Sequence, residues 1–246
     1  MILFHYFFYV FYRLWFYLLV LLPILVLLPF LLLSILKESW YPYYFRLARI
    51  WARIILFGMG FIPIIKRDAQ YKDDVSYMFI ANHTSMTDIM LMLYTTKKPF
   101  VFVGKKELSK IPLFGFFYKR TCILVDRNDA RSKLEVFNSV QKRFNMGLSV
   151  CIFPEGGVPD DMDILLDNFK DGAFRLAIEH NIPVAPMTFH DNKKRFPFAF
   201  FSGSPGKMRV KIHKIFLTNT LKVEDKRNLR NQTRNLILGE LKQPTV

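Results

Sequence analysis

Residues 75–94 read VSYMFIANHTSMTDIMLMLY, and this stretch decides the fold that the sequence predicts. Residues 75–81 form a short apolar run containing aromatic and β-branched side chains, which is typical of a buried strand. Residues 85–94 begin with Ser, Thr and Asp and continue with an apolar run, a pattern that predicts a helix. A strand followed directly by a helix indicates an α/β fold, and the polar residues at this junction lie where such sheets form ligand sites.

The same alternation continues along the rest of the chain. Further strands are expected at residues 100–103, 122–125, 148–153 and 183–189, and helices at residues 132–145, 166–181 and 222–241. Ser132 and Glu135 have the spacing of a capping box at the start of the helix over 132–145. We therefore predict an α/β fold class, with a mixed sheet flanked by helices.

The N-terminal segment is almost entirely apolar. Between residues 2 and 36 the only ionisable side chains other than tyrosines are His5 and Arg13. As one helix this segment would be about 52 Å long, whereas a bilayer's hydrocarbon core is about 30 Å thick. We expect either a single span with an aromatic-rich interfacial overhang or a helix broken near Pro23 and Pro29. A cleaved signal peptide fits poorly, because the run is too long and no small-residue cleavage site follows it; a buried core helix is the remaining alternative.

The segment over residues 40–65 has a different pattern. Arg46, Arg49 and Arg53 recur at helical spacing among apolar residues, which predicts a basic amphipathic helix lying in a membrane interface. Six basic residues follow the apolar run, and only Arg13 lies within it. The six are Lys37, Arg46, Arg49, Arg53, Lys66 and Arg67. The positive-inside rule therefore places the rest of the chain on the cytoplasmic face of the cell membrane, and a re-entrant hairpin would give the same side.

The sequence thus predicts an N-terminal membrane-docking element, with an anchor and an amphipathic helix, in residues 1–70 and a globular α/β domain in residues 71–246. The chain is 52% hydrophobic and has a net charge of +15, with 35 basic residues against 20 acidic ones. This apolar content excludes a disordered chain, and two cysteines in 246 residues exclude a disulfide scaffold. Cys122 and Cys151 fall in predicted strands and are expected to be reduced core thiols.

The segment Asn82-His83-Thr84-Ser85-Met86-Thr87-Asp88 is the first candidate for chemistry. The imidazole of His83 can serve as a general base, and Asp88, five residues later, can fold back to fix its tautomer and orientation. No serine or cysteine nucleophile has an obvious place beside the pair, so the base would act directly on a substrate hydroxyl. The alternative is that Ser85 and Asp88 only cap the helix.

Three further segments follow predicted strands or precede helices. Glu155, Gly156 and Gly157 follow a strand in Phe-Pro-Glu-Gly-Gly, where glycines let backbone amides approach a ligand, although an ordinary turn would have the same composition. Lys105 and Arg127 carry cations near strand ends, and the guanidinium of Arg127 suits a phosphate. Taken singly, both are more often solvated charges.

Taken in order, these segments resemble the motifs of glycerolipid acyltransferases, and in particular of 1-acylglycerol-3-phosphate acyltransferases. The similarity covers about residues 75–190. Its motifs here are Asn82-His83 with Asp88, Lys105-x-Glu107-Leu108 with Pro112 and Gly115, Val125-Asp126-Arg127, Phe153-Pro154-Glu155-Gly156, Phe169-Lys170-Asp171-Gly172-Ala173 and Ile182-Pro183-Val184-Ala185-Pro186.

The resemblance implies roles for particular residues. His83 is implied to be the base that takes the proton of the acceptor hydroxyl, with Asp88 orienting it. Lys105, Arg127, Glu155, Gly156 and Gly157 are implied to bind the acceptor and its phosphate. The implied donor is a thioester on coenzyme A or acyl carrier protein, used as a co-substrate, with no cofactor or metal. The implied partners are the membrane bilayer and a lysophospholipid substrate, without nucleic acid.

One departure concerns the acceptor. The family's third motif usually continues Thr-Arg-Ser, but here it continues Gly157-Val158-Pro159, so a phosphate ligand is missing. An acidic stretch follows, which we interpret as a solvated loop and helix start. Another lysolipid, such as a lysophospholipid with a larger head group or an acylated amino-acid lipid, is therefore an alternative acceptor. Charge alone also permits a membrane-anchored nucleic-acid-binding protein, but the basic residues form separate clusters rather than one basic-aromatic stripe.

Overall fold

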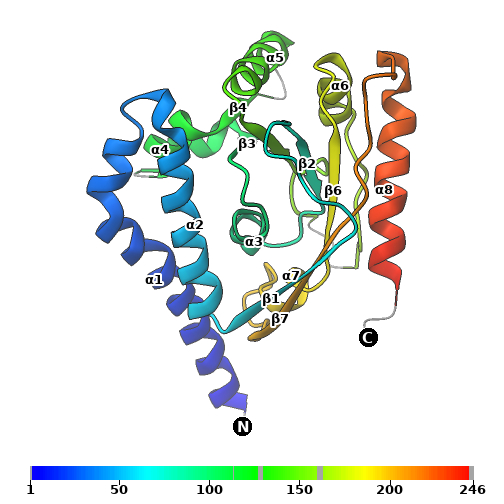
Figure 1. Ribbon diagram of the computed structural model, residues 1–246. Helices are drawn as coiled ribbons and strands as arrows, with labels where there is room; N and C mark the ends of the chain where they lie inside the picture. The colour runs from blue at the N-terminus through cyan, green and yellow to red at the C-terminus, as the bar shows by residue number, and fades with distance from the viewer. Residues whose placement is uncertain (1, 113, 127–129, 160–162, 244–246) are drawn as a thin grey trace. The chain divides into compact units, whose positions relative to one another are not determined.

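The computed structural model describes residues 2–112, 114–126, 130–159 and 163–243 (Figure 1). The chain divides into two compact units, each assembled from three separate segments. The first unit comprises Met1–Lys66, His83–Lys97 and Phe189–Lys211, and the second comprises Arg67–Asn82, Lys98–Thr188 and Ile212–Val246.

The second unit contains a sheet of parallel strands in the order β6-β2-β5-β3-β4. Their bounds in that order are Val184–Phe189, Met78–Ala81, Ser149–Ile152, Phe100–Lys105 and Ile123–Val125. Strand β2, which lies between β6 and β5, is buried along its whole length and pairs Phe79 with Cys151 of β5 and with Ala185 of β6. Because these strands are parallel, their carboxyl ends lie at the same end of the sheet, and the segments that follow β2, β3 and β5 leave the sheet there.

The sheet is mixed, as predicted. Past the end of β7 (Gly206–Ile212), Val184 and Phe216 exchange two backbone hydrogen bonds of 2.9 Å in an antiparallel bridge. The helices of this unit are α4 (Phe114–Thr121), α5 (Ala130–Asn145), α6 (Gly172–Glu179) and α8 (Lys226–Lys242), with short 3₁₀ turns at Lys106–Lys110 and Val223–Asp225. Helix α5 packs on β4 and β5, and α6 packs on α8. These contacts confirm the predicted α/β class with flanking helices.

Two local predictions in this unit were wrong. The helix expected over residues 166–181 begins only at Gly172, because the N–H groups of Asp167 and Lys170 donate to Glu155 Oε2 and to the Pro154 carbonyl, both at 2.9 Å. Ser132 does not cap α5, which already begins at Ala130. Its hydroxyl instead accepts from the N–H of Asp126 at 2.9 Å and so ties the end of β4 to the helix.

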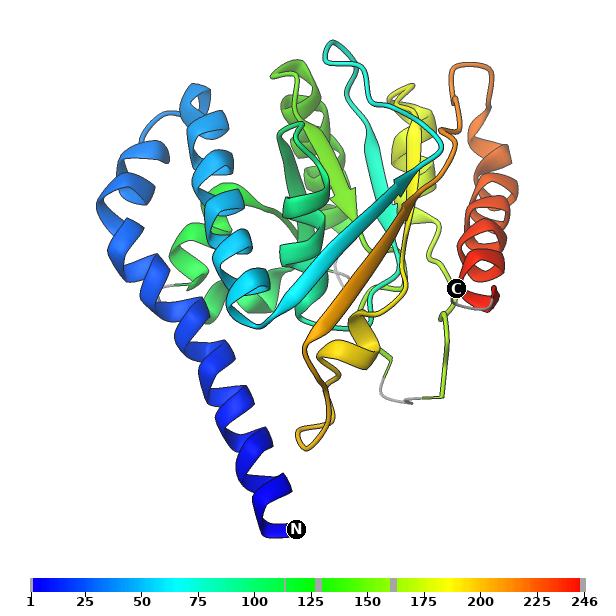
Figure 2. The ribbon, with the colours of Figure 1, turned by 60° about the horizontal axis from the view of Figure 1, so that its bottom comes forward.

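The first unit begins with the long helix α1 (Ile2–Ser34), which continues through Pro23 and Pro29 without a break. Its stretch from Tyr6 to Ser34 is long and apolar enough to cross a membrane, and only 11% of its most apolar window is buried. The helix packs against α2 (Tyr41–Gly58), and the two lie side by side in Figures 1 and 2. The indole N–H groups of Trp15 and Trp51 fix this pairing by donating across it to the carbonyls of Gly58 and Val20, at 2.8 and 3.0 Å.

The amphipathic helix expected over residues 40–65 ends earlier than predicted. Gly60 has a φ of +70° and terminates α2, and residues 61–67 form the strand β1 (Phe61–Arg67) instead. Arg49 does not face lipid alone, since its Nε donates to the carbonyl of Leu93 in α3 (Thr87–Thr95) at 3.0 Å. The unit is completed by α7 (Asn192–Arg195) and β7 (Gly206–Ile212).

Candidate active site

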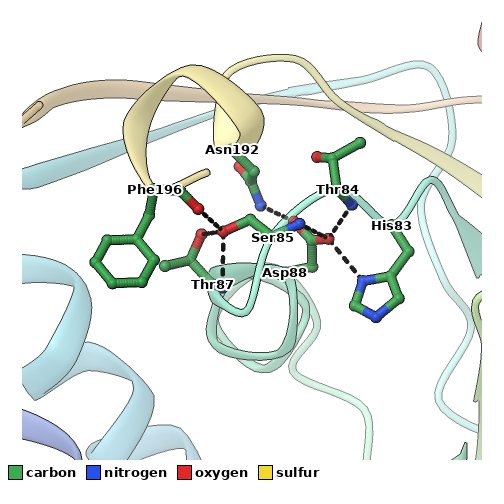
Figure 3. Close-up of polar contacts among 7 residues, drawn as sticks. All are labelled: His83, Thr84, Ser85, Thr87, Asp88, Asn192 and Phe196. Carbon is green, nitrogen blue, oxygen red and sulfur yellow. Dashed lines mark hydrogen bonds and ion pairs between the residues drawn. The ribbon is translucent and has the colours of Figure 1, made fainter. Parts of the chain in front are cut away.

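His83 and Asp88 lie together at the start of α3, within the first unit (Figure 3). His83 follows β2 by two residues, and its Nδ1 lies 2.8 Å from Oδ2 of Asp88. An ionised carboxylate can only accept, so Nδ1 carries the proton in the neutral imidazole and Nε2 is left as the basic nitrogen. The imidazole is 21% exposed, whereas the carboxylate is fully buried. The sequence prediction that Asp88 folds back onto His83 is therefore met by the geometry.

Asp88 is held by more than the imidazole. Its Oδ2 also accepts from the backbone N–H groups of Thr84 and Ser85, at 2.6 and 2.9 Å, and its Oδ1 accepts from the side-chain amide of Asn192 at 2.5 Å. A buried carboxylate is costly unless it is fully hydrogen-bonded, and these donors offset that cost. Asp88 thus holds both the turn that precedes α3 and the imidazole of His83.

The turn between β2 and α3 is fixed by its hydroxyl groups as well. The Ser85 hydroxyl donates to the carbonyl of Phe196 at 2.5 Å, and it accepts from the N–H of Thr87 at 3.1 Å. Ser85 and Thr87 are fully buried. Ser85 is therefore a structural anchor of the turn before α3, and it is not the N-cap of α3, because that position is occupied by Met86.

Asn192 is a site residue that the sequence reasoning missed. It lies 104 positions after Asp88, begins the short helix α7 and is fully buried. The preceding residue, Asp191, receives the N–H and Nε of Arg209 at 2.8 Å each, and its other oxygen receives Nη2 at 2.5 Å. Burial raises the pKa of Asp191, but the hydrogen bonds and charge of Arg209 outweigh burial and leave that pKa below its usual value. This ion pair holds the start of α7, and with it the amide that reaches Asp88.

The other predicted binding residues lie in the second unit. Lys105 ends β3, and a methyl group on Gly157 would lie 3.6 Å from its Nζ, so the two predicted binding segments meet there. Gly156 adopts a φ of +84° in the turn after β5, where its N–H donates to the carbonyl of Phe153 at 3.1 Å. That backbone conformation favours glycine and aims the next amides away from the strand. Arg127 lies outside the described residues.

Glu155 has a structural partner in addition to its predicted binding role. It is buried, and its Oε2 accepts from the backbone N–H of Asp167. It thereby fastens the segment leading to α6 onto the turn after β5. Beyond that segment Asp171 forms an ion pair with Arg230 of α8 at 2.6 Å, so this part of the acidic stretch is not simply solvated.

The glycine of the second motif has a packing role. A Cβ on Gly115 would lie 2.2 Å from the carbonyl oxygen of Ser109, so only glycine lets α4 begin directly over the 3₁₀ turn that follows Lys105. The N–H of Gly115 donates to the Ile111 carbonyl at 2.7 Å. The Lys-x-Glu-Leu…Pro-x-x-Gly spacing is therefore explained by a tight turn.

Comparison with known proteins identifies the family of the chain. Residues 63–190, just over half of the chain, match the family model described as Acyltransferase. The chain is 30% identical over 174 residues to 1-acyl-sn-glycerol-3-phosphate acyltransferase LPAT1 of Arabidopsis thaliana chloroplasts, covering 68% of this chain and 47% of that protein. It is 38% identical over 116 residues to the 1-acyl-sn-glycerol-3-phosphate acyltransferase of Escherichia coli (strain K12), which covers 45% of each chain. The chain thus spans about half the length of these relatives.

A solved structure has the same fold. The crystal structure of the 1-acyl-sn-glycerophosphate (LPA) acyltransferase PlsC from Thermotoga maritima superposes with a TM-score of 0.78 and covers 96% of this chain and 98% of that one. Sequence identity is 19%, so this likeness concerns the fold alone.

Proposed function

The chain belongs to the acyltransferase family, and from this we propose that it transfers an acyl group from a thioester to the free hydroxyl of 1-acylglycerol 3-phosphate, forming phosphatidic acid. The thioester would be acyl-CoA or an acyl carrier protein. The observation that carries the proposal is the His83–Asp88 pair, in which a buried and fully hydrogen-bonded carboxylate orients a partly exposed imidazole. The ordered motifs and the similarity to proteins named 1-acyl-sn-glycerol-3-phosphate acyltransferase support it.

In the proposed mechanism Nε2 of His83 takes the proton of the acceptor hydroxyl as its oxygen attacks the thioester carbonyl carbon. The resulting tetrahedral intermediate then collapses and its C–S bond breaks. His83 returns its proton to the departing sulfur, which leaves as the free thiol. Asp88 stabilises the imidazolium between these steps and does not itself take the proton. A base of this kind contributes about 10²–10⁴-fold to the rate.

The acceptor phosphate is assigned to Lys105, to Arg127 and to the amides around Gly156 and Gly157. Lys105 supplies a point charge and Arg127 a planar fork that suits phosphate. The nearness of Lys105 Nζ to Gly157 supports this assignment, because it brings a cation beside a turn whose glycines leave the backbone accessible.

A second acceptor class remains open within the same chemistry. Val158 stands where the family's third motif usually carries a phosphate-binding arginine, which favours testing lysophospholipids with larger head groups and acylated amino-acid lipids. Purified protein assayed against an acceptor panel distinguishes these cases. Preference for lysophosphatidic acid supports the main proposal, whereas a tenfold or greater preference for another acceptor replaces it.

We also assign the catalytic part to the cytoplasmic face of the cell membrane. The basic residues that follow α1, including Arg46 and Arg53, favour the cytoplasmic side. In sealed right-side-out vesicles, protease added outside should leave the globular part intact, and digestion from outside would reverse the assignment.

The catalytic assignment is tested by His83→Ala and Asp88→Ala, assayed with an acyl thioester and lysophosphatidic acid. Both should lose about 10²-fold or more of the wild-type rate. His180→Ala is the matched control, because that imidazole hydrogen-bonds Gln141 and stacks on Phe137 on the helices of the second unit. Wild-type turnover by the His83→Ala protein would overturn the mechanism.

A further inference from the structure

The loop over residues 197–203, between α7 and β7, exposes a cluster of phenylalanines, and we call it the phenylalanine loop. Phe198, Phe200 and Phe201 are 53%, 46% and 52% exposed. Figure 2 shows the loop projecting beyond the ends of α7 and β7. Three neighbouring phenylalanines on one projecting loop form an apolar patch of the kind that marks an interaction surface.

The loop is rigidly closed at its base. Arg195, at the end of α7, donates from Nη1 to the Ser204 hydroxyl and the Pro205 carbonyl at 2.9 Å each, and from Nε to the Lys207 carbonyl at 3.0 Å. Gly203 has a φ of +116°, and a Cβ there would lie 2.6 Å from the Arg195 carbonyl. The exposed rings are therefore displayed by a fixed scaffold and lose little entropy on binding.

The same loop is fastened to α1. The buried guanidinium of Arg13 donates to the carbonyls of Pro197, Ala199, Phe200 and Ser202 at 2.5–3.1 Å. It also lies 4.1 Å from the ring centre of Phe196. Arg13 is the only Lys or Arg within α1, and its charge is satisfied entirely by this loop among the described contacts. These contacts hold the phenylalanine loop beside the aromatic-rich N-terminal turns of α1.

The surfaces of the two elements are continuous. Tyr6 of α1 contacts Phe201 edge to face at 4.9 Å, and the neighbouring rings of Phe7 and Phe11 on α1 are exposed. Aromatic residues of this kind are typical of membrane interfaces. The loop is flanked by exposed Lys194 and Lys207, whose charge suits anionic head groups and disfavours a cationic or purely apolar protein partner.

We propose that the phenylalanine loop inserts into the membrane interface beside α1 and forms a second membrane contact with anionic lipid at its base. This inference rests on the proposed membrane association of α1 and goes beyond it. Membrane attachment then has two points in the first unit, one on the N-terminal helix and one about 185 residues later in the sequence. The buried residue that precedes this loop, Phe196, accepts the hydrogen bond of the Ser85 hydroxyl.

The test places an environment-sensitive fluorophore (NBD) on single introduced cysteines in full-length protein reconstituted into phosphatidylcholine vesicles, with and without phosphatidylglycerol. The labelled variants are Phe198→Cys for the loop, Val26→Cys for the exposed face of α1, and Leu217→Cys as an exposed apolar control in the second unit. Burial raises the pKa of Cys122 to about 12 and that of Cys151 well above its usual value, so the native thiols should not take up label, and the unmodified chain checks this.

Quenching by aqueous iodide is the readout. The labels at positions 26 and 198 should be quenched several-fold less than the label at 217, and protection at 198 should increase with phosphatidylglycerol. Protection at 26 with full quenching at 198 would overturn this inference and leave the α1 anchor intact. Full quenching at both positions would overturn membrane association itself.

A second variant tests the contribution of the rings without a label. Phe198→Ser should weaken vesicle binding about fivefold, and Phe198→Ser with Phe201→Ser about 30-fold, from the transfer of half-exposed aromatic surface. Leu217→Ser is the matched control and should bind as wild type. Unchanged binding of the double variant, with an unchanged circular-dichroism spectrum, would refute the proposal.

Discussion

Removing the amide of Asn192 isolates the support of the candidate base from the base itself. Asn192→Ala deletes one of the four groups that hydrogen-bond to Asp88 and leaves His83 and the two backbone donors in place. The amide must present Nδ2 to the carboxylate, because the flipped amide would set an oxygen against it. The substitution therefore removes a charge-assisted bond without altering the chemistry of the base.

The magnitude follows from the burial of both partners. A hydrogen bond to a charged group contributes about 1.5–3 kcal/mol, and Asn192 and Asp88 are both fully buried. If all of this energy were expressed in orientation of the base, kcat would fall by about 10–150-fold. The loss should stay below that of Asp88→Ala, since three donors remain. Stability should decrease by a similar energy, which lowers Tm by roughly 3–12 °C in a chain of this size.

The assay is thiol release from an acyl thioester with lysophosphatidic acid, measured with Tm on the same preparation. Ile237→Val is the stability control: it removes a buried methylene from α8 at a cost of about 1 kcal/mol and touches no residue of the site. It should lower Tm and leave kcat unchanged. Asn192→Asp should be worse than Asn192→Ala, because it places a second carboxylate beside Asp88. If Asn192→Ala keeps the wild-type kcat, Asn192 does not position the base and the reasoning fails.

Three further predictions concern packing and ion pairs. Gly115→Ala should lower Tm by several degrees or prevent folding, because its methyl group would meet the Ser109 carbonyl oxygen. Gly147→Ala is the control: Gly147 is exposed and has a positive φ, so the change in Tm of this variant reports backbone strain alone. Arg13→Met should cost about 3 kcal/mol or more in a chemical denaturation curve, because it leaves four loop carbonyls, one buried and three part-buried, without their donor. A cost under 1 kcal/mol would contradict the anchoring role. Asp191 should stabilise the folded state in a pH-dependent way, because its pKa is lower in the folded than in the unfolded chain. This stability is complete above the unfolded pKa of about 3.8 and is lost as the pH falls through the lower folded pKa. Arg209→Met should flatten this acid dependence of Tm.

Much of the fold was predictable because its signals are local. The apolar runs that became β2, β3, β5 and β6 and the periodic segments that became α5 and α8 were located to within a few residues. The start of α6 was not predictable, because residues 166–171 have a helical pattern but give their N–H groups to the turn that carries Glu155. Strands β1 and β7 were missed, since β1 begins inside what the sequence presents as an amphipathic helix.

The candidate site divides in the same way. His83 and Asp88 lie five residues apart, so their spacing alone indicated the pair that the structure forms at 2.8 Å. Asn192 is separated from Asp88 by 104 residues, and nothing in Asp191-Asn192-Lys193 marks it as a partner of a carboxylate. A contact of that range depends on how β6 and α7 are placed by tertiary packing, which single-sequence patterns do not report.

The clamp between Arg13 and the phenylalanine loop also constrains the order in which the molecule can be made. The carbonyl partners of Arg13 are synthesised 184–189 residues after Arg13 itself. At 5–20 residues per second this delay is roughly 10–40 s. During that time a nascent helix with exposed aromatic rings carries a guanidinium without its native acceptors. The first unit therefore cannot close until its last segment, Phe189–Lys211, has been synthesised and has reached α1.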